Sequence, residues 1–228
     1  MNNSSISVIG ADVLFVDEHL VVLNKYSGID VIPARGENRM PSLRENAQSA
    51  LGCRLFVVHR IDRDTSGVVV LCRNADAHRC LSLQFERRQV SKTYLAVVMG
   101  IMERGGAIDL PIRQFGSGRM GVDSQGKPST TVVSVTGYLR NATEVTVSPQ
   151  TGRRHQIRVH LYHEGHPVLG DRLYGAIRPV DGVERLMLHA SSITLVHPCG
   201  KPVTFNAPVD SKWSEIVGRL RLPGDGGV

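Results

Sequence analysis

The sequence has 228 residues, of which 41% are hydrophobic and 21% charged, and its net charge at pH 7 is +6. No apolar run approaches the ~18–20 residues of a membrane-spanning helix, and the N-terminus has no basic segment followed by an apolar one. We therefore expect a cytoplasmic protein with no membrane partner. Four scattered cysteines without a CxxC pair argue against a disulfide or zinc framework. The basic excess favours a polyanionic partner, and residues 54–94 carry eight Lys and Arg against four Asp and Glu.

Local signals predict two helices in the first half of the chain. Ser42 followed by Glu45 is a capping box at the start of the first helix, and Asn74 is suited to cap the second. In the second helix Ala77 and Leu81 lie on the predicted inner face, together with Phe85. The predicted elements of this half are strands at 13–16, 20–23, 55–58 and 68–72 and helices at 43–51 and 75–88.

The second half of the chain predicts mainly strands. Residues 113–129 are rich in Gly, Ser and polar side chains and indicate a loop. The formal GxGxxG match at 116–121 lacks the preceding strand and following helix of a dinucleotide site. A short helix is expected in which Arg154 and Arg158 share a face at i, i+4. The other predicted elements are strands at 92–99, 131–135, 143–147, 186–196 and 201–205 and a helix at 213–220. The strands at 131–135 and 143–147 are expected to be adjacent and joined around Asn141.

Residues 59–67 form a charged loop between two β-branched, apolar runs. The loop contains Asp62 and Asp64 with two arginines, and Thr65-Ser66-Gly67 is suited to a tight turn at its end. A polar loop on a rigid scaffold is a common way to build an active site. The alternative is a solvated loop whose ion pairs contribute little to stability.

Two further side chains have both a structural and a functional interpretation. Arg158 is predicted on the inner side of its helix, and a buried arginine needs a carboxylate partner from elsewhere in the chain. Tyr94 shares a strand face with Ala96 and Val98, so on the pattern alone a core tyrosine with a satisfied hydroxyl is favoured over a functional one.

Four histidines between residues 155 and 166 raise the question of a metal site. Their spacing matches neither H-E-x-x-H nor H-x-x-E-H, and no cysteine lies nearby. We therefore predict no metal. The four are His155, His160, His163 and His166.

Several segments resemble, in order, the motifs of the RluA-type pseudouridine synthases. The resemblance extends from about residue 13 to residue 208 and includes no separate N-terminal RNA-binding domain, as in the short members of that family. Two positions depart from the pattern: Ile61 replaces the usual Leu, and Tyr26 stands where an early turn normally has Pro. The matching segments are 59–67 (H-R-L-D-x-x-T-S-G), 92–96 (K-x-Y-x-A), 126–131 (G-K-P-x-x-T), 151–160 (T-G-R-x-H-Q-I-R-x-H), 166–175 (H-P-I-x-G-D-x-x-Y-G) and 188–190 (L-H-A).

The resemblance implies an α+β pseudouridine synthase fold, with a bent, mostly antiparallel central sheet and flanking helices and loops. We expect one catalytic domain over residues 13–222, with tails at 1–12 and 223–228. The expected state is a monomer. The expected partner is RNA, namely a stem-loop of tRNA, of 23S-type large-subunit ribosomal RNA, or of both.

The resemblance also implies a chemistry that needs no added cofactor. Asp62 takes the position of the catalytic aspartate, which detaches uracil from ribose so that it can rotate and rejoin through carbon. Tyr94 would stack on the uracil and help to remove its ring proton, and Arg158 would pair with Asp62. Arg60 would fill the gap left when the base is flipped out of the stem-loop. The remaining predicted substrate-binding residues are His59, Thr65 and Leu188.

Three expectations depend on these roles. Asp64 occupies a variable motif position and is interpreted as structural. Arg158→Met is expected to abolish turnover with the fold largely intact. A non-catalytic RNA-binding protein and a metal-dependent hydrolase are the competing functions; the first could have lost Asp62, Tyr94 or Arg158, and the second would require the histidine cluster.

Overall fold

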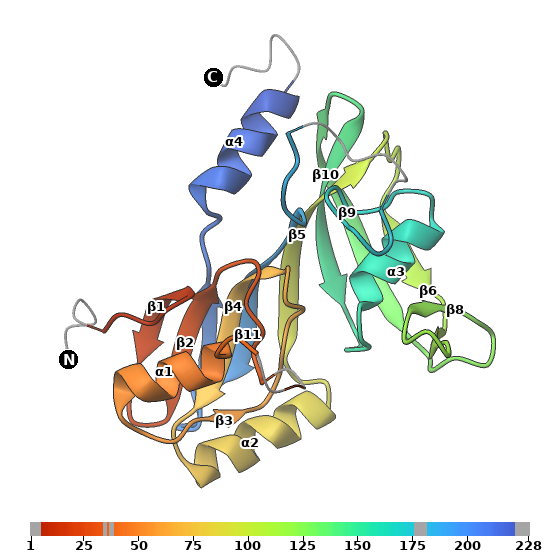
Figure 1. Ribbon diagram of the computed structural model, residues 1–228. Helices are drawn as coiled ribbons and strands as arrows, with labels where there is room; N and C mark the ends of the chain where they lie inside the picture. Colours follow the sequence, from red (N-terminus) through yellow and green to blue (C-terminus); the bar gives the residue numbers. More distant parts are fainter. Residues whose placement is uncertain (1–5, 34–35, 37–38, 176–181, 222–228) are drawn as a thin grey trace. The chain divides into compact units, whose positions relative to one another are not determined.

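The computed structural model describes residues 6–33, 36, 39–175 and 182–221. The helices in these ranges are α1 (Leu43–Leu51), α2 (Ala75–Glu86), α3 (Gln156–His163) and α4 (Ser211–Leu220) (Figure 1). The strands are β1 (Ala11–Val16), β2 (Leu20–Lys25), β3 (Phe56–Val57), β4 (Ser66–Cys72), β5 (Ser91–Met99), β6 (Gly106–Asp109), β7 (Ile112–Gln114), β8 (Met120–Val122), β9 (Thr130–Leu139), β10 (Ala142–Pro149), β11 (Leu188–Val196) and β12 (Pro202–Asn206).

Ten of these strands form one sheet in the order β1-β2-β4-β11-β5-β10-β9-β6, with β12 paired to β11 and β3 paired to β4. Strands β7 and β8 form a separate pair. The pairings whose registers are described are all antiparallel. The predicted α+β fold with a mostly antiparallel sheet is therefore confirmed.

The chain forms two compact units. Unit 1 contains residues 1–92 and 190–208, and unit 2 contains residues 93–189 and 209–228. The expected domain limits at residues 13 and 222 stay predictions. Strand β1 begins at Ala11, and residues 1–5 and 222–228 lie outside the described residues.

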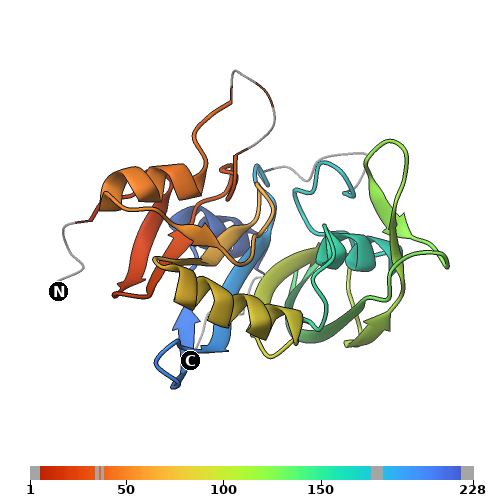
Figure 2. The same cartoon turned by 90° about the horizontal axis from the view of Figure 1, so that it is seen from below.

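In unit 1, helix α1 lies beside β1 and β2, and α2 lies beside β3 and β4 (Figure 1, Figure 2). All seven residues of β4 are buried, as expected for a central strand with covered faces. The predicted capping box is present, because the Ser42 hydroxyl accepts from Glu45 N and the Glu45 side chain accepts from Ser42 N. Asn74 caps α2 as predicted. Gln84 of α2 is buried and bonds both backbone groups of Val196, which fixes the helix against β11.

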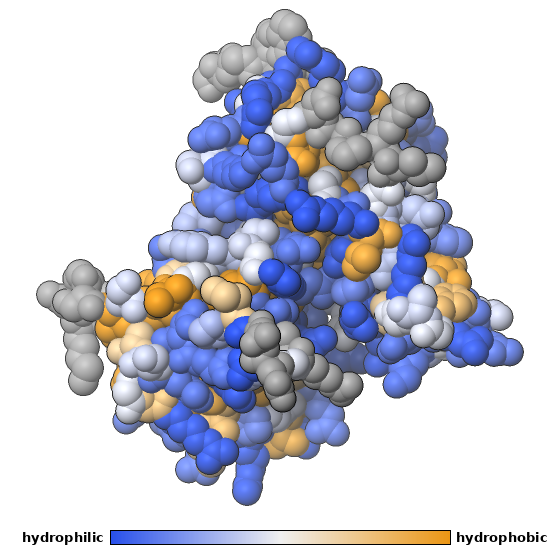
Figure 3. All heavy atoms as spheres, viewed as in Figure 1, coloured by the Kyte–Doolittle hydropathy of each residue, from blue (hydrophilic) through white to orange (hydrophobic). Residues whose placement is uncertain are grey.

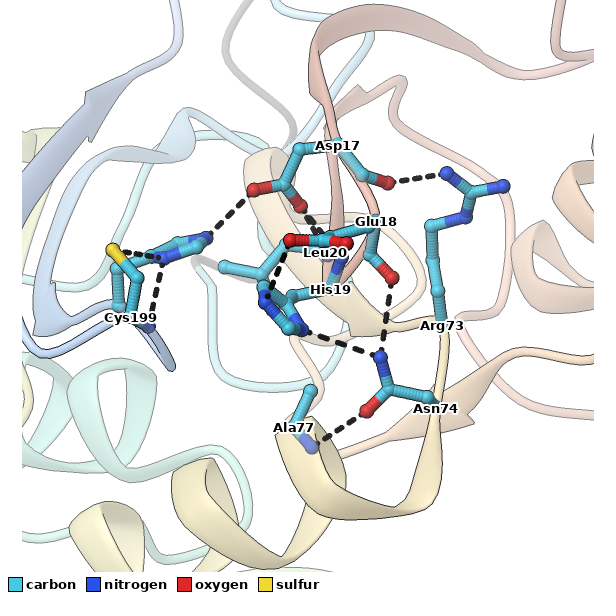
Figure 4. Close-up of polar contacts among 9 residues, drawn as sticks. Asp17, Glu18, His19, Leu20, Arg73, Asn74, Ala77 and Cys199 are labelled. Carbon is cyan, nitrogen blue, oxygen red and sulfur yellow. Dashed lines mark hydrogen bonds and ion pairs between the residues drawn. The ribbon is translucent and has the colours of Figure 1, made fainter.

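A polar cluster at the β1–β2 turn ties together three connections of unit 1 (Figure 4). Asp17 accepts hydrogen bonds from the backbone of its own turn, and its Oδ2 lies 2.9 Å from Nε2 of His197 in the β11–β12 turn. Nδ1 of His197 lies 2.9 Å from Sγ of Cys199. Arg73, at the end of β4, donates to the Asp17 carbonyl. This cluster stands at the end of β4 opposite to the Asp62 loop, because Leu20 of the turn pairs with Cys72.

In unit 2, strands β5, β10, β9 and β6 are neighbours in that order, and α3 packs against β8, β9 and β10. The core includes Trp213 and Ile216 of α4, whose N-cap is Asp210. Asn141 forms the turn between β9 and β10 with a φ of 54°, as its predicted position required.

Two expectations for unit 2 were wrong. Residues 113–129 are not simply a loop, because β7 and β8 pair as a hairpin there; with three residues each, the strands are too short to show an alternating pattern. Arg154 does not share a helix face with Arg158, since α3 begins only at Gln156 and Arg154 is exposed in the preceding turn. The turn ends at His155, which has a left-handed φ of 56°.

Hydrophilic side chains cover most of the face drawn in Figure 3, and apolar residues gather there in smaller patches. None of the helices in the described ranges has the length and hydropathy that a membrane span requires.

Candidate active site

The Asp62 loop in unit 1 is held mainly through its backbone. Gly28 N donates to the Arg63 carbonyl at 2.9 Å, and the Ser27 hydroxyl donates to the Asp64 carbonyl at 2.7 Å. In the reverse direction, Nε of Arg63 donates to the Gly28 carbonyl at 3.0 Å. The turn after β2 therefore fixes the main chain next to Asp62, whatever side chain stands at position 64.

We call these contacts between the turn after β2 and the Asp62 loop the clamp. Lys25 lies at its centre and was not predicted from the sequence. Its side chain is fully buried, and Nζ donates to the carbonyls of Tyr26 at 2.9 Å, Ile29 at 2.8 Å and Arg63 at 2.8 Å. A buried ammonium group is tolerated only when its donors are satisfied. The three carbonyls meet this condition and join the turn to the loop. The signal in the sequence was a lysine at the end of a strand whose other residues are uncharged and mostly apolar.

Tyr26 shows what the missing proline of that turn changes. Its backbone N–H donates to the Gly10 carbonyl at 2.8 Å, a bond that proline could not make. Its hydroxyl donates to Oδ1 of Asp12 at 2.6 Å, and this hydrogen bond raises the pKa of Tyr26. Two hydrogen bonds thus take over the restraint that a fixed proline ring would give.

His59 is held as a neutral ring at the start of the loop. Val70 N donates to Nε2 at 2.9 Å, so Nε2 is unprotonated and the neutral ring carries its proton on Nδ1. The ring stacks on Phe85 with centroids 5.0 Å apart. Burial, and to a lesser extent the nearby Lys92 charge, lowers the pKa of His59 to about 3. These contacts give His59 a role in positioning the loop; its predicted contact with substrate stays a prediction.

The loop side chains alternate between anchored and accessible. Ile61 and Thr65 are buried and anchor the loop on either side of Asp62, which is half-buried. Arg60 and Asp64 are exposed. The conservative change at Ile61 therefore preserves an apolar anchor, and Arg60 is available to solvent as its predicted role requires.

Gly67, the last residue of the loop motif, is needed for a close main-chain contact. It has a φ of 114°, and a Cβ on it would lie 2.2 Å from the carbonyl oxygen of Ala190. No larger residue could occupy this position without moving β4 away from β11. Two of the matched motifs, T-S-G and L-H-A, thus meet at their backbones.

In unit 2, Arg158 forms a buried, two-pronged ion pair with Asp171. Nε and Nη2 lie 2.7 Å and 2.8 Å from the two carboxylate oxygens, and the side chains are 5% and 0% exposed. Asp171 also accepts from the backbone of Leu173 and Tyr174. Burial acts to raise the pKa of Asp171, but the hydrogen bonds and charge of Arg158 outweigh it, so the pKa lies below its ordinary value. The sequence predicted a carboxylate partner for Arg158 but did not identify Asp171, which belongs to the 166–175 motif.

A network of buried side chains holds the start of α3. Oε1 of Gln156 accepts from the Thr151 hydroxyl at 2.7 Å and from Arg153 N at 3.0 Å. Its Nε2 donates to the Thr130 carbonyl at 2.9 Å and to the Thr131 hydroxyl at 3.0 Å. The fixed letters Thr151, Arg153 and Gln156 of the 151–160 motif and Thr131 of the 126–131 motif are therefore joined by hydrogen bonds at the start of the helix that carries Arg158.

His155 and His160, two of the clustered histidines, are hydrogen-bonded to neighbouring groups of unit 2. His155 Nδ1 lies 2.9 Å from the Tyr174 hydroxyl, and the two His160 nitrogens each lie 2.9 Å from an oxygen, the Thr131 hydroxyl and the Leu110 carbonyl. Burial lowers the pKa of His160. Within the ranges that the structure describes, no group of three or more His, Cys, Asp or Glu side chains is arranged to hold a metal ion.

The remaining predicted residues of unit 2 lie on strands. Tyr94 is half-buried on β5, opposite Val147 of β10, and packs against the core of unit 2. Leu188 is 3% exposed at the start of β11 and belongs to the same core.

The predicted site residues are thus divided between the units. Unit 1 brings together His59, Arg60, Asp62 and Thr65 on one loop, and unit 2 carries Tyr94, Arg158 and Leu188. The catalytic roles of these residues, including the pairing of Arg158 with Asp62, stay predictions at this point.

Comparison with known proteins places this geometry in a family. Residues 19–163, which include Asp62, Tyr94 and Arg158, match the family described as RNA pseudouridylate synthase. The chain is 37% identical to the ribosomal large subunit pseudouridine synthase C of Vibrio vulnificus, covering 92% of this chain and 69% of that protein. It is 33% identical to the tRNA pseudouridine synthase C of Yersinia pestis, covering 93% of this chain and 92% of that protein.

A solved structure shows the same fold. The human RNA pseudouridylate synthase domain containing 1 is 27% identical and superimposes with a TM-score of 0.76, covering 94% of this chain and 96% of that one. Fold, family match and relatives agree, and the chain belongs to the RluA-type family of RNA pseudouridine synthases, which are isomerases.

Proposed function

We propose that this enzyme isomerises specific uridines in stem-loops of tRNA, of large-subunit ribosomal RNA, or of both. The relatives named above include one protein named for each RNA class, at similar identity. The net charge of +6 is suited to a polyanionic substrate. Phosphate contacts would give affinity, and the choice of uridine would depend on the shape of the stem-loop.

Asp62 is the proposed nucleophile. The N1–C1′ bond of the uridine breaks, the freed uracil rotates, and C5 forms the new bond to C1′. The C5 proton leaves and N1 gains a proton, so no atom is gained or lost and no cofactor is required. The observation that supports this role best is the clamp of Lys25, Ser27 and Gly28 on the backbone beside Asp62, since a nucleophile must be held in position.

Arg158 is proposed to keep Asp62 ionised. An arginine next to a carboxylate favours its charged form. A guanidinium has five N–H donors, and the bonds to Asp171 are compatible with a second carboxylate on the same group. In this proposal Asp171 and the Gln156 network fix the orientation of Arg158, and Arg158 acts on Asp62.

Tyr94 and Arg60 are proposed to receive and replace the flipped base. A uridine inside a stem-loop must leave the stack, at a cost of a few kcal/mol. Tyr94 would stack on the extruded uracil and assist loss of its C5 proton. The exposed Arg60 would enter the gap and lower the cost of extrusion.

The test is release of tritium from RNA labelled at uridine C5, because every turnover frees that hydrogen. Wild-type enzyme should release tritium, and Asp62→Asn should lower the rate by at least about 10³-fold. Asp64→Asn is the matched control, a carboxylate of the same loop whose backbone carbonyl, not its side chain, makes the described contact; it should stay within about threefold of wild type. Loss of activity in Asp64→Asn with retention in Asp62→Asn would reverse the assignment.

Mapping of pseudouridines in cells identifies the substrate. Total RNA from a strain lacking the gene would be labelled with carbodiimide and read by primer extension, with complementation by wild type or by Asp62→Asn. A position lost in the deletion and restored only by wild type names the RNA. If no position changes and both proteins restore growth, a non-catalytic RNA-binding role replaces this proposal.

A further inference from the structure

Unit 2 contains a cavity of about 370 Å³ between the β7–β8 hairpin and α3, and none of the residues described as lining it was given a catalytic role above. Its size falls within the roughly 300–1,000 Å³ typical of small-ligand sites. Val159 and Tyr174 are buried and line it, and Met120 adds a third apolar group. None of the described side chains that line it is a carboxylate.

Two aromatic rings at this cavity are exposed to solvent. Phe115 of the hairpin is 44% exposed, and Tyr162 of α3 is 47% exposed. The Phe115 ring is positioned over Gly121, because a Cβ on that glycine would lie 2.8 Å from Cε2 of the ring. Solvent-exposed rings beside an apolar hollow are a platform for a flat, unsaturated ligand.

Arg119 adds a positive charge to this platform. Its guanidinium carbon lies 5.8 Å from the ring centre of Tyr162 and 5.1 Å from that of Tyr174. Within the part of the chain that the structure describes, no Asp or Glu oxygen lies close enough to Arg119 to form an ion pair. A flat apolar surface next to an uncompensated guanidinium matches a nucleotide, whose base stacks and whose phosphate is anionic.

We propose that this cavity binds one unpaired base of the RNA substrate, other than the uridine that is isomerised. The base stacks against Phe115 and Tyr162, and its phosphate contacts Arg119. The inference rests on the proposed RNA substrate and adds a second point of attachment to it. Such a contact makes the enzyme prefer stem-loops that hold an unpaired nucleotide in addition to the target uridine.

Tyr174 connects this cavity to Arg158, the residue proposed to pair with Asp62. The guanidinium carbon of Arg158 lies 5.2 Å from the ring centre of Tyr174, and Arg119 contacts the same ring. The Tyr174 hydroxyl also accepts from Met120 N and lies 2.9 Å from His155 Nδ1, at the turn before α3. A base in the cavity therefore packs on the hairpin and helix whose positions Tyr174 joins.

Kinetics on the RNA identified by mapping give the first test. Tyr162→Ala should raise KM about 5- to 50-fold with kcat within twofold, because base stacking on an aromatic ring contributes to binding and not to the isomerisation. Tyr162→Phe, which keeps the ring, should behave as wild type. Tyr138→Ala is the matched control, since Tyr138 is also 47% exposed in unit 2 but lies on β9 outside the cavity. Equal KM values for Tyr162→Ala, Tyr138→Ala and wild type would overturn the inference.

Cross-linking gives a readout that does not depend on turnover. A single-stranded oligouridylate carrying 4-thiouridine is irradiated with the full-length protein, and the attached peptides are identified by mass spectrometry. The inference requires attachment at Phe115, Tyr162 or their immediate neighbours, reduced at least fivefold by Arg119→Met and unchanged by Arg104→Met, an exposed arginine outside the cavity. Attachment only elsewhere would contradict it.

The two proposals fail in different ways. If wild-type enzyme releases no tritium from any RNA, the proposed function is wrong, and cross-linking alone then decides whether the cavity binds a base. If wild type is active while Tyr162→Ala binds and cross-links normally, only the cavity inference is wrong.

Discussion

The Asp62 loop of unit 1 and the turn before α3 in unit 2 are held by different means. The loop is fixed through carbonyl oxygens and backbone N–H groups, with Lys25 as the main side chain involved. The α3 turn is fixed by side chains that bond one another, centred on Gln156. The difference teaches how to interpret the motifs: a loop held by its backbone tolerates variable letters, whereas a turn held by side chains depends on the identity of the side chains that bond one another, here Thr131, Thr151 and Gln156.

Arg158→Met should have the largest effect on stability, contrary to the sequence-based expectation of an intact fold. The substitution leaves the carboxylate of Asp171 buried, charged and without the arginine, which costs about 3–5 kcal/mol. Urea unfolding followed by the fluorescence of Trp213, the single tryptophan, would measure this change. The double variant Arg158→Met/Asp171→Asn removes the buried charge and should recover at least half of the loss without recovering activity. Recovered activity would contradict the proposed role of Arg158.

Lys25→Met should be the next most severe change, at about 3 kcal/mol. It removes three charge-assisted hydrogen bonds; the carbonyls of Tyr26 and Ile29 lose the Lys25 donor, and that of Arg63 keeps its bond from Gly28 N. Unfolding followed by circular dichroism measures the stability, and tritium release should show kcat lowered at least tenfold because the loop beside Asp62 loosens. Lys201→Met, an exposed lysine in the same unit, is the control. Equal kcat values for Lys25→Met and Lys201→Met would show that the Asp62 loop does not depend on the Lys25 hydrogen bonds.

Gln156→Met should cost roughly 2–3 kcal/mol, since both ends of the buried amide are bonded. Gln150→Met provides the contrast: Gln150 is exposed and makes a single described side-chain bond, to the Ser148 carbonyl, so its loss should cost under about 0.5 kcal/mol. Urea midpoints at constant slope compare the two. Similar losses would show that side-chain bonding does not determine the stability of this turn.

His59 should make stability depend on pH. Its pKa is lowered to about 3 by burial, whereas an unfolded histidine titrates near 6.5. The neutral His59 ring therefore makes its full contribution to the free energy of unfolding above about pH 6.5. This contribution is lost as the pH falls from 6.5 toward 3, because the unfolded chain binds a proton that the folded protein does not. Between pH 7.5 and 5.0 the wild type should lose about 2 kcal/mol more than His59→Gln in urea unfolding. His163→Gln, at an exposed position, should lose as much stability as wild type over the same pH range. Identical losses in all three proteins would show that His59 does not stabilise the loop.

Asp64→Asn should have the smallest effect, below about 0.5 kcal/mol. The described contact at this position is made by its backbone carbonyl, which any residue supplies. Differential scanning calorimetry at pH 7 would show a midpoint within about 2 °C of wild type. A large shift would mean that the side chain at this variable position carries a contact of its own, and the contrast between the two regions would weaken.

Sequence predicted what is local and missed what depends on distant partners. The Ser42 capping box, the Asn74 cap and the Asn141 turn each involve residues within four positions of one another, and all three are confirmed. Asp171 could not be assigned to Arg158 by periodicity, because the two lie 13 residues apart on different segments. Lys25 reaches Arg63 across 38 residues, so its role was visible only in three dimensions.

The hairpin of β7 and β8 was missed for another reason. Its strands have three residues each, and most of Ile112–Gln114 is exposed, so neither length nor alternation distinguishes them from a loop. The same polarity and exposure leave Phe115 and Arg119 at the mouth of a cavity. A segment that sequence analysis dismissed is the one on which the further inference depends.

The contact between Gly67 and Ala190 limits how the Asp62 loop can be transferred to another protein. The loop ends where two main chains meet with no room for a side chain between them. Grafting residues 59–67 alone onto another sheet would place this glycine beside a strand at ordinary spacing, and the loop would lose the surface against which its last turn rests. A graft should therefore contain residues 59–67 together with the start of β11, which carries L-H-A, although the two segments are far apart in the sequence.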